Sequence, residues 1–369
     1  MKGEIPMSIW IWILLIGYLA WLVWEKQAND RALKSFRYVI HVNGIRGKTG
    51  VSRLIDAHLR GAGYRVFTKT TGSTPCYIDT EGVEHQIRRL GNANIGEQLR
   101  MIRRACREKA EVLILECMAV QPELQKVAQE QMVRGNMNVI TNVRYDHVFE
   151  MGETLEEIAE SLANTVPENG MLFTSDEDFY PYFREVARKK NTEVILCREN
   201  EFARTENEAI ACALGRAIGI PEEDFPQHIS CYKEDFGAHR MYEMEKGYFL
   251  NLFSANDPQS TKKLMDSFYD DTSDVVLLYN NRTDRPDRLL LFLRHFFPIV
   301  KCRKIIVMGT SRGLALRLLR KYGFGNICQA KSWQEAVALC DGADVVGIGN
   351  IKGQAYDMIT HYEGGENHE

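Results

Sequence analysis

Residues 39–50 read VIHVNGIRGKTG, and this segment carries the strongest structural signal in the chain. Its first four residues are apolar except for His41, which predicts a buried β-strand. Two glycines then flank a short loop, and Gly-Lys-Thr opens a predicted helix. Backbone N–H groups of such a loop and the helix N-terminus attract phosphate oxygens. A plain glycine turn beside a surface lysine is the alternative, but the order of strand, loop and helix favours a phosphate site.

The loop has the short form G-x-x-G-K-T. The longer form of most kinases and GTPases needs a glycine five residues before Gly47, where this chain has Val42. The ammonium of Lys48 can neutralise the outer phosphates, and the hydroxyl of Thr49 can join the shell of a Mg²⁺ ion. The short form therefore predicts an ATP site of the kind used by ATP-dependent amide ligases.

The composition of the chain is that of a globular protein with two or three domains. It has 369 residues, 45% hydrophobic and 26% charged, and a net charge of −4, which argues against broad nucleic-acid binding. The nine cysteines are scattered without a C-x-x-C pair. They predict reduced thiols of a cytosolic protein rather than a disulfide or zinc framework.

The N-terminus predicts a single-pass membrane anchor. Residues 8–24 carry no charge and would span roughly 26 Å as a helix, close to the thickness of a bilayer core. More basic residues follow this segment than precede it, which predicts an outside N-terminus and cytoplasmic catalytic domains at the cell membrane. A cleaved signal peptide is the alternative, but it would export the loop away from ATP, and no small-x-small cleavage site precedes Trp24.

Apolar strands alternate with helices through the rest of the chain. This pattern predicts an α/β fold whose mostly parallel sheet is covered on both faces. We expect strands at 38–42, 65–68, 111–116 and 137–141, with helices at 48–62, 97–109, 123–133 and 206–219. A capping box of Thr154 and Glu157 should open a further helix that ends at Val166. A second α/β pattern, with strands at 248–253, 275–278, 304–308 and 345–348, places the domain boundary near 235–240.

Two further predicted strands end in residues suited to chemistry. Glu116 ends an otherwise apolar strand, where a carboxylate is costly unless it is paired or bound to a metal, so we expect it to bind Mg²⁺ beside Thr49. Its alternative role is to cap the next helix. After the next strand, a neutral His147 could bind a second Mg²⁺ and Asp146 could orient its ring, although a hydrogen-bonded loop pair is equally plausible.

The order of these motifs resembles the Mur ligase and folylpolyglutamate synthetase superfamily, and within it the membrane-bound poly-γ-glutamate synthase subunits of the PgsB/CapB family. The resembling strings extend through nearly the whole chain: 43–48, 94–98, 116–120, 146–155, 255–257 and 349–353. The resemblance implies a membrane anchor and connector at 1–37, a Mur-ligase-like P-loop ATP-binding domain at 38–236 and a smaller Rossmann-like ligase domain at 237–369.

The resemblance also implies roles for individual residues. ATP would contact the loop residues Gly44, Ile45, Arg46, Gly47, Lys48, Thr49 and Gly50, with Asn207 near the adenine. Arg240 would reach the phosphates when the domains close, and Mg²⁺ would bind Thr49, Glu116 and His147. Asn256 and Asp257 would face the reacting carboxylate. The catalytic set is therefore expected to be Lys48, Glu116, His147, Arg240, Asn256 and Asp257.

Three departures from the superfamily narrow the expected function. Mur ligases carry a nucleotide-sugar domain before the loop, where only the anchor and connector stand here, so a muropeptide substrate is not expected. Residues 153–170 contain no lysine to match the carbamylated lysine of several members. The segment 255–257 lacks the usual histidine or lysine, which leaves the positioning of the acceptor open.

These features predict an ATP-dependent amide ligase that makes poly-γ-glutamate from glutamate at the cytoplasmic membrane face. The implied partners are a small integral-membrane PgsC/CapC-type subunit, an extracellular PgsA/CapA-type protein and further copies in an oligomer. One alternative is another γ-glutamyl ligase such as a folylpolyglutamate synthetase, which the anchor argues against. A non-catalytic ATP-binding scaffold of an export complex is the other alternative. The stereochemistry of glutamate, the polymer length and the growth direction stay open.

Two arginine-rich clusters lie outside the predicted catalytic set. Arg100, Arg103, Arg104 and Arg107 follow helical spacing and form one basic stripe opposite an apolar face. A solvated surface is one interpretation, and a track for a polyanionic product or an acidic partner is the other. Arg282, Asp284, Arg285 and Arg288 form the second cluster, which could bind substrate carboxylates or form an internal ion-pair network.

Overall fold

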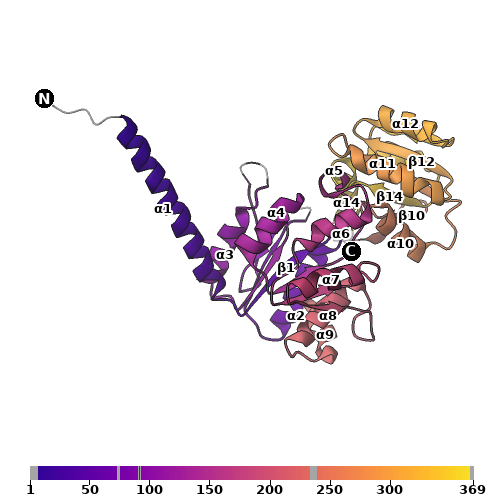
Figure 1. Cartoon of the computed structure of the whole chain (residues 1–369). Coiled ribbons are helices and arrows are strands. Elements are labelled where there is room, and N and C mark those ends of the chain that lie inside the picture. The colour runs from indigo at the N-terminus through magenta and orange to yellow at the C-terminus, as the bar shows by residue number, and fades with distance from the viewer. Residues whose placement is uncertain (1–6, 73–74, 90, 92, 233–238, 366–369) are drawn as a thin grey trace. The chain divides into compact units, whose positions relative to one another are not determined.

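The computed structural model describes residues 7–72, 75–89, 91, 93–232 and 239–365, and the chain forms two compact units. The first unit comprises residues 1–142 and 161–233, and the second comprises 143–160 and 234–369. The predicted boundary between residues 236 and 237 lies outside the described residues. Both units contain mostly parallel sheets, so the predicted α/β fold is confirmed (Figure 1).

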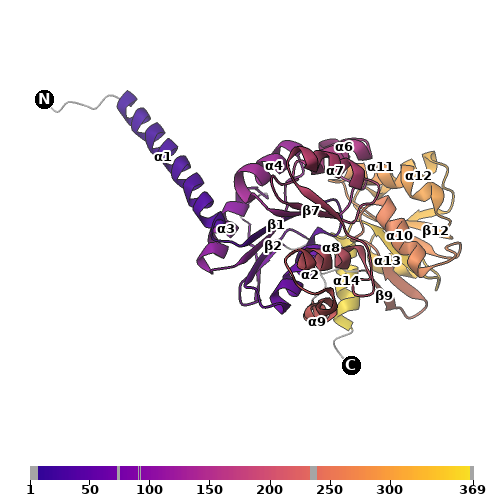
Figure 2. The same cartoon turned by 60° about the horizontal axis from the view of Figure 1, so that its bottom comes forward.

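One continuous helix, α1 (Met7–Leu33), contains the predicted anchor and most of the connector, which was expected to extend to residue 37. Within the described residues it is the one helix long and apolar enough to cross a membrane, from Ile9 onward. The side chains of residues 9–24 are exposed, and Figures 1 and 2 show this part of α1 extending away from the sheet of its own unit. This weakly supports the predicted single-pass anchor.

Within the described residues, the first unit contains an eight-stranded sheet in the order β4-β3-β2-β5-β1-β6-β7-β8. Its strands are β1 (Tyr38–Asn43), β2 (Val66–Thr70), β3 (Cys76–Ile78), β4 (Glu84–Gln86), β5 (Val112–Glu116), β6 (Met137–Ile140), β7 (Met171–Thr174) and β8 (Glu193–Leu196). All neighbours pair in parallel except β2–β3 and β3–β4. β1 lies between β5 and β6, so the phosphate loop leaves the middle of the sheet.

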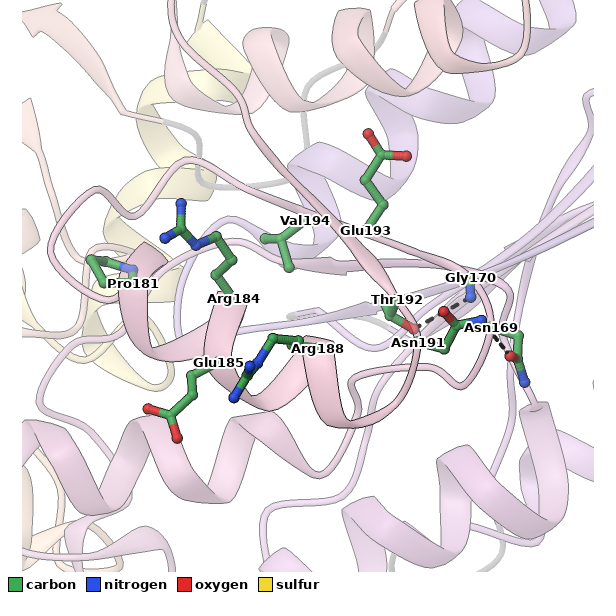
Figure 3. A pocket seen from close by; sticks show the side chains of 10 residues that line it. All are labelled: Asn169, Gly170, Pro181, Arg184, Glu185, Arg188, Asn191, Thr192, Glu193 and Val194. Carbon is green, nitrogen blue, oxygen red and sulfur yellow. Dashed lines mark hydrogen bonds between the residues drawn. The ribbon is translucent and has the colours of Figure 1, made fainter.

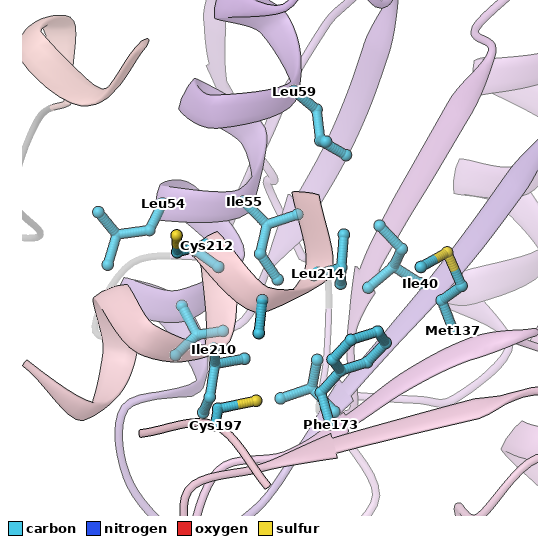
Figure 4. Packing of buried hydrophobic residues seen from close by; sticks show 14 of the residues in the cluster. Ile40, Leu54, Ile55, Leu59, Met137, Phe173, Cys197, Ile210, Cys212 and Leu214 are labelled. Carbon is cyan, nitrogen blue, oxygen red and sulfur yellow. The ribbon is translucent and has the colours of Figure 1, made fainter. Parts of the chain in front are cut away.

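Helices cover both faces of this sheet. They are α2 (Lys48–Gly61), α3 (Glu97–Arg107), α4 (Pro122–Val127), η1 (Ala128–Val133), α7 (Tyr180–Lys189), α8 (Glu206–Ala217), η2 (Glu222–Asp224), α9 (Phe225–His228) and η3 (Ile229–Cys231). On β1, Ile40 and Val42 pack with α2 and α8 in the core cluster shown in Figure 4, whereas Val39 packs with α3 and η1 on the other face. This alternation follows from the two-residue period of a strand.

The polar residues of β1 point to the same face as Val39. The His41 Nδ1 lies 2.9 Å from the Gln129 Oε1, and the Asn43 amide donates to the Gln125 Oε1 over 2.8 Å. Both glutamines lie on α4 and η1, where the predicted helix 123–133 changes from α to π geometry. The wider turn of a π-helix is common at functional sites. Here it places the two amides against the strand that leads into the loop.

The second unit contains a six-stranded sheet, within the described residues, in the order β13-β12-β11-β14-β10-β9. Its strands are β9 (Arg240–Glu243), β10 (Tyr248–Asn251), β11 (Val276–Asn281), β12 (Lys304–Gly309), β13 (Ile327–Gln329) and β14 (Val345–Gly349). Its helices are α5 (Val148–Met151), α10 (Pro258–Phe268), α11 (Pro286–His295), η4 (Phe297–Ile299), α12 (Arg312–Lys321), α13 (Trp333–Ala338) and α14 (Gln354–Gly365). Among the described strands of this sheet, β9 alone pairs antiparallel, and apolar clusters lie on both faces.

The helix α6 (Leu155–Ala163) begins in the second unit and ends in the first. The predicted capping box precedes it, because the Thr154 N–H donates to the Glu157 carboxylate over 3.0 Å and the Glu157 N–H donates to the Thr154 hydroxyl over 3.2 Å. Tyr145, on the chain that precedes α6, stacks on His295 with ring centroids 4.8 Å apart. These contacts hold residues 143–160 as part of the second unit.

Stability of the first unit is expected to fall as the pH drops from 7 to 5. Burial lowers the pKa of His41 to about 4, and burial together with neighbouring His228 lowers the pKa of His58 to about 4. Both rings are protonated more readily in the unfolded chain than in the folded one. Their contribution to folding stability is therefore complete above pH 6.5 and is lost as the pH falls toward 4. Each should cost about 1–2 kcal/mol at pH 5, measured as the pH dependence of unfolding in detergent. His58→Gln should reduce that pH dependence, and an unchanged slope would contradict this account.

Candidate functional site

The phosphate loop requires glycine at two positions. Gly44 has a φ of 121°, and a Cβ there would lie 2.0 Å from the Thr141 Oγ1. Gly47 has a φ of 79° and forms the N-cap of α2, where a Cβ would lie 2.6 Å from the Asn207 Oδ1. Other residues would therefore meet both backbone strain and a steric clash. The close approach also places Asn207, at the start of α8, directly beside the loop.

The end of β6 holds the loop in shape. The Ile45 N–H donates to the Asn142 backbone oxygen over 3.2 Å, and the Arg46 N–H donates to the Asn142 side-chain oxygen over 3.0 Å. The Thr141 hydroxyl and the Asn142 amide both donate to the Arg46 carbonyl. The shape of the loop thus depends on residues almost one hundred positions away, which the local motif could not reveal.

Lys48 lies over the loop rather than extending into solvent. Its ammonium donates to the Gly44 carbonyl over 2.6 Å and to the Ile45 carbonyl over 3.3 Å. The chain reversal at Gly47 makes this return contact possible, because Lys48 is the first residue of α2. A positive charge therefore lies at the loop, where a phosphate chain would need it.

Glu116 lies at the end of β5 with 2% of its surface exposed and accepts hydrogen bonds from both flanking threonines. The Thr49 hydroxyl donates to its Oε2 over 3.0 Å, and the Thr71 N–H donates to the same oxygen over 2.7 Å. The Thr71 hydroxyl donates to its Oε1. Thr49 and Glu116 thus come together as predicted, and Thr71 is an addition that the sequence did not single out.

The donor set around Glu116 fits a Mg²⁺ ion. Mg²⁺ binds oxygen atoms and is commonly held by one or two carboxylates with substrate phosphates. The carboxylate of Glu116 and the hydroxyl of Thr49 supply such oxygens at the loop. In the described part of the chain, no group of three His, Cys, Asp or Glu side chains could hold a metal alone.

A buried charge network supports the strand that leads to Thr71. Lys69, on β2, is fully buried, and its ammonium lies 3.0 Å from the Glu97 Oε1 and 3.4 Å from the Met118 sulfur. Arg89 binds both carboxylate oxygens of Glu97, over 2.8 and 3.0 Å. Gln98 completes the network by donating to the Glu116 backbone oxygen over 3.1 Å.

The charges in this network depend on one another. Burial alone would raise the pKa of Glu97, but hydrogen bonds from Arg89 and Lys69 and their positive charges outweigh it and lower the pKa to about 2. Burial lowers the pKa of Lys69, and the adjacent Glu97 carboxylate opposes that shift. No sequence pattern predicted a role for Lys69, Arg89 or Glu97. Residues 94–98 were recognised as a motif, but the motif did not indicate that Glu97 pairs with Lys69 on β2.

In the second unit, the Asp146-His147 pair meets the second arginine cluster. The Arg288 guanidinium lies 3.3 Å from the Asp146 carboxylate and donates to the Asn256 Oδ1 over 3.0 Å. The Arg285 Nη1 lies 3.1 Å from the His147 Nδ1, whereas the Asp146 carboxylate lies 3.7 Å from the His147 Nε2. Asp146 therefore contacts Arg288 more closely than it contacts the histidine ring, and this part of the cluster is an internal polar network.

The backbone is strained at two of these positions. His147 has a φ of 53° and Asn256 a φ of 61°, both in the left-handed region. Such strain is concentrated at functional sites in proteins. Asp257 follows Asn256, is fully buried and accepts a hydrogen bond from the Ser260 N–H over 2.8 Å, so it caps α10. Arg240 begins the edge strand β9 and is exposed.

The predicted site residues are thus divided between the two units. The first unit contains the loop residues, Glu116 and Asn207, and the second contains His147, Arg240, Asn256 and Asp257. The metal set of Thr49, Glu116 and His147 includes residues of both units. The catalytic roles given to these residues stay predictions.

Known families match both units. The family described as "Mur ligase middle domain" matches residues 42–221, and "Poly-gamma-glutamate synthase CapB C-terminal domain" matches residues 238–365. "Capsule biosynthesis protein CapB" of Bacillus anthracis is 34% identical over 390 residues, covering 97% of this chain and 83% of the relative. The chain belongs to the CapB family. "PGA synthase CapB" of Bacillus subtilis (strain 168) is 32% identical over 384 residues, covering 95% of the chain and 97% of the relative.

Solved structures share the fold of this CapB-family chain. E. coli FolC in complex with ADP has a TM-score of 0.68 at 17% identity and covers 95% of this chain and 98% of its own. A bifunctional folylpolyglutamate synthase/dihydrofolate synthase with Mn, AMPPNP and L-glutamate bound has a TM-score of 0.66 at 16% identity, with coverage of 91% and 93%. The CapB relatives and the Mur ligase middle-domain match confirm the predicted family, and the solved structures confirm the predicted folylpolyglutamate-synthetase-like fold.

A surface hollow of about 1040 Å³ lies elsewhere on the CapB-family chain, between α7 and the edge strand β8 (Figure 3). Its lining includes Gly170 and Thr192, the residues that directly precede β7 and β8. These strands run parallel to β1, so the hollow is at the amino ends of strands whose carboxyl ends share an edge with the loop. Ligands of open α/β sheets bind at the carboxyl ends, and we assign the hollow no part in catalysis.

Gly44→Ala is expected to abolish nucleotide binding while the rest of the fold persists. The new methyl group would meet the Thr141 hydroxyl in a backbone conformation that alanine rarely adopts, so the loop must move. Gly63→Ala is the control, because Gly63 also has a positive φ but has open space around it. Titration with a fluorescent ATP analogue should show binding in the control only, and normal binding by Gly44→Ala would contradict the required loop geometry.

Proposed function

We propose that this chain is an ATP-dependent amide ligase that extends poly-γ-glutamate by one glutamate per ATP at the cytoplasmic membrane face. The observation that carries the proposal is the arrangement of Lys48, Thr49 and Glu116 at the carboxyl ends of β1 and β5. Membership in the CapB family supplies the substrate class. A carboxylate is a poor electrophile, and ATP supplies the energy for its activation.

The chain's own residues would bind and orient ATP in the first unit. The loop would wrap the phosphate chain, with Gly44 and Gly47 allowing close approach of the backbone. The Lys48 ammonium would exchange its contacts to loop carbonyls for phosphate oxygens and offset the charge of the transferred group. Asn207, beside Gly47, is proposed to orient the nucleotide.

Mg²⁺ is the divalent ion we propose for this site, held by Thr49 and Glu116, with His147 as a proposed further ligand. When bound, it would neutralise charge on the phosphates during transfer. The Thr71 N–H and hydroxyl fix the Glu116 carboxylate in place. Oriented ligands of this kind reduce the reorganisation needed during the reaction.

The proposed chemistry has two steps. A γ-carboxylate oxygen first attacks the γ-phosphorus of ATP, which forms an acyl phosphate and releases ADP. The amino group of the second glutamate species then attacks the acyl carbon, forming the amide and releasing phosphate with loss of one proton. Arg240, Asn256 and Asp257 of the second unit are the proposed contacts to the phosphates and the reacting carboxylate.

The polar network of Asp146, Arg288 and Asn256 would hold the second unit's part of the site in position. Arg288 is almost fully buried, so we propose that it positions other groups instead of binding substrate directly. Arg285, which contacts His147, is the better placed arginine to meet a substrate carboxylate.

We further propose that α1 anchors the protein as a single-pass helix with its N-terminus outside. The exposed apolar residues 9–24 and the basic residues after them support this orientation. One such helix cannot form an export path for a polyanion, so we propose a small integral-membrane PgsC/CapC-type partner, an extracellular PgsA/CapA-type protein and an oligomer.

Trapping of the acyl phosphate tests the proposed reaction. Membranes carrying the full chain, with and without the integral-membrane partner, would receive ATP, Mg²⁺ and radiolabelled glutamate. We expect one ADP per amide bond, and added hydroxylamine should divert the label into a γ-glutamyl hydroxamate. ATP binding without hydroxamate or polymer in either membrane preparation would overturn the ligase and favour an ATP-binding scaffold.

A further inference from the structure

The apolar part of α1 passes into a firmly packed part without any flexible connector. Trp24 is the last residue of the uncharged segment, and the next residue, Glu25, accepts a hydrogen bond from the Arg103 guanidinium on α3 over 2.6 Å. Contact with the first unit thus begins one residue after the apolar segment ends. The figures show α1 and α3 side by side in both views (Figures 1 and 2).

The remainder of α1 is fixed to the unit by further contacts. The Asn29 amide donates to the Met132 carbonyl of η1 over 2.8 Å, and Asp30 forms an ion pair with Arg134 over 3.1 Å. Ala32 is buried against the same core that contains Ile102 of α3. These contacts extend along α1 for about two turns, so the helix and the unit should move as one body.

The contacts also define which end of α3 is nearer the apolar segment. Arg103 contacts Glu25, whereas Cys106, one turn later on α3, contacts the Ser35 hydroxyl over 3.4 Å. Glu25 lies eight positions before Leu33, the last residue of α1, which is roughly 12 Å along the helix, and Ser35 follows two positions after Leu33. The direction from Cys106 to Arg103 therefore points toward the apolar segment. Arg100, one turn before Arg103 and exposed, lies further in that direction.

The four arginines of α3 consequently have different surroundings. Arg104 binds Glu108 over 2.8 Å and lies over the Tyr77 ring, and Arg107 is exposed at the end of α3 remote from the apolar segment. Arg103 pairs with Glu25 in the middle of α3, and Arg100 is exposed toward the other end. Lys26 of α1, next to Glu25, is also exposed. Glu97 adds no exposed charge there because it is buried with Lys69 and Arg89.

We propose that Lys26 and Arg100, beside the ion pair of Arg103 with Glu25, form a lipid-facing surface that contacts the anionic headgroups of the membrane in which α1 is embedded. The inference rests on the proposed anchoring, because the position of α1 in the bilayer determines how far α3 lies from the membrane surface. Each basic side chain near an anionic surface contributes about fivefold to binding. The surface would hold the ATP-binding unit in one orientation against the membrane.

Arginine labelling in nanodiscs tests the lipid-facing surface. The full chain would be placed in discs of phosphatidylcholine alone or with about one third phosphatidylglycerol, treated with phenylglyoxal and analysed by mass spectrometry. This reagent is uncharged, so surface potential does not concentrate it. We expect Arg100 to react several-fold more slowly in the anionic discs, with Arg107 as the matched control on the same helix reacting equally in both. Lys26→Glu should reduce the protection of Arg100.

Equal labelling of Arg100 in both discs, while the chain stays bound to them, would overturn the lipid-facing surface. Protection of Arg100 by added poly-γ-glutamate in neutral discs, without protection by anionic lipid, would overturn it in favour of a product track. The measurement uses no ATP or glutamate, so it does not depend on the ligase reaction. Failure of the chain to remain with the discs would instead contradict the anchoring itself.

Discussion

Replacing Lys48 by alanine is expected to reduce glutamate incorporation by about 10²–10³-fold at saturating ATP, the usual cost of removing one group that stabilises transition-state charge. The Lys48 ammonium is the cation that the structure places over the loop carbonyls, where the outer phosphates would lie. Steady-state incorporation of radiolabelled glutamate by membranes with the full chain and its partner would measure the effect.

Two controls make the Lys48 result interpretable. Lys126→Ala removes an exposed lysine of α4 in the same unit and should leave incorporation unchanged. The thermal unfolding temperature of Lys48→Ala should stay close to that of the natural protein, which separates catalysis from folding. Incorporation by Lys48→Ala within a few-fold of the natural protein would refute the assignment of this lysine to phosphate transfer.

Glu97→Gln is expected to lower the free energy of unfolding by about 3 kcal/mol or more, because it removes the carboxylate that contacts the buried Lys69 ammonium. Glutamine keeps the shape of the side chain but not its negative charge, while Lys69 stays fully enclosed on β2. Denaturant titration of the detergent-solubilised protein would measure the loss. The same change should also reduce activity, since β2 leads directly into the residues that hold Glu116.

The double variant Lys69→Met, Glu97→Gln provides the decisive comparison. Removing both charges should recover a large part of the lost stability, because a buried pair replaced by neutral groups of similar volume is often tolerated. Glu185→Gln is the surface control, since Glu185 forms an exposed ion pair with Lys189 on α7 and should leave stability unchanged. If Glu97→Gln had the same free energy of unfolding as the Glu185→Gln control, the buried ion-pair network would not contribute to the stability of the fold.

Sequence patterns correctly predicted the strands and helices whose own residues form an apolar run or a recognisable motif. The segment 39–50 produced β1, the loop and α2 nearly to the residue, because apolar alternation and the Gly-Lys-Thr string are local properties. The strands β5, β6, β11, β12 and β14 likewise matched runs of apolar residues within one to three positions at each end. The expected proximity of Glu116 and Thr49 is confirmed, because Glu116 ends β5 and Thr49 follows the neighbouring parallel strand β1.

Elements whose stability comes from their neighbours were missed. β7 and β8 have only four residues each, and β3, β4 and β13 have three, too few for a periodic pattern to stand out. The π geometry of η1 was also unforeseen, because it depends on packing against β1 and α1 and not on composition.

The sequence by itself determined the class of fold, the phosphate loop and the apolar segment, since each is encoded in contiguous residues whose chemistry suffices. Only the tertiary structure decided which distant groups meet them. It placed Asn142 on the loop, Thr71 on Glu116, Glu97 on Lys69 and Arg103 on Glu25. Such pairings join positions 28 or more residues apart, and burial and charge select them only after the sheet has brought the strands together.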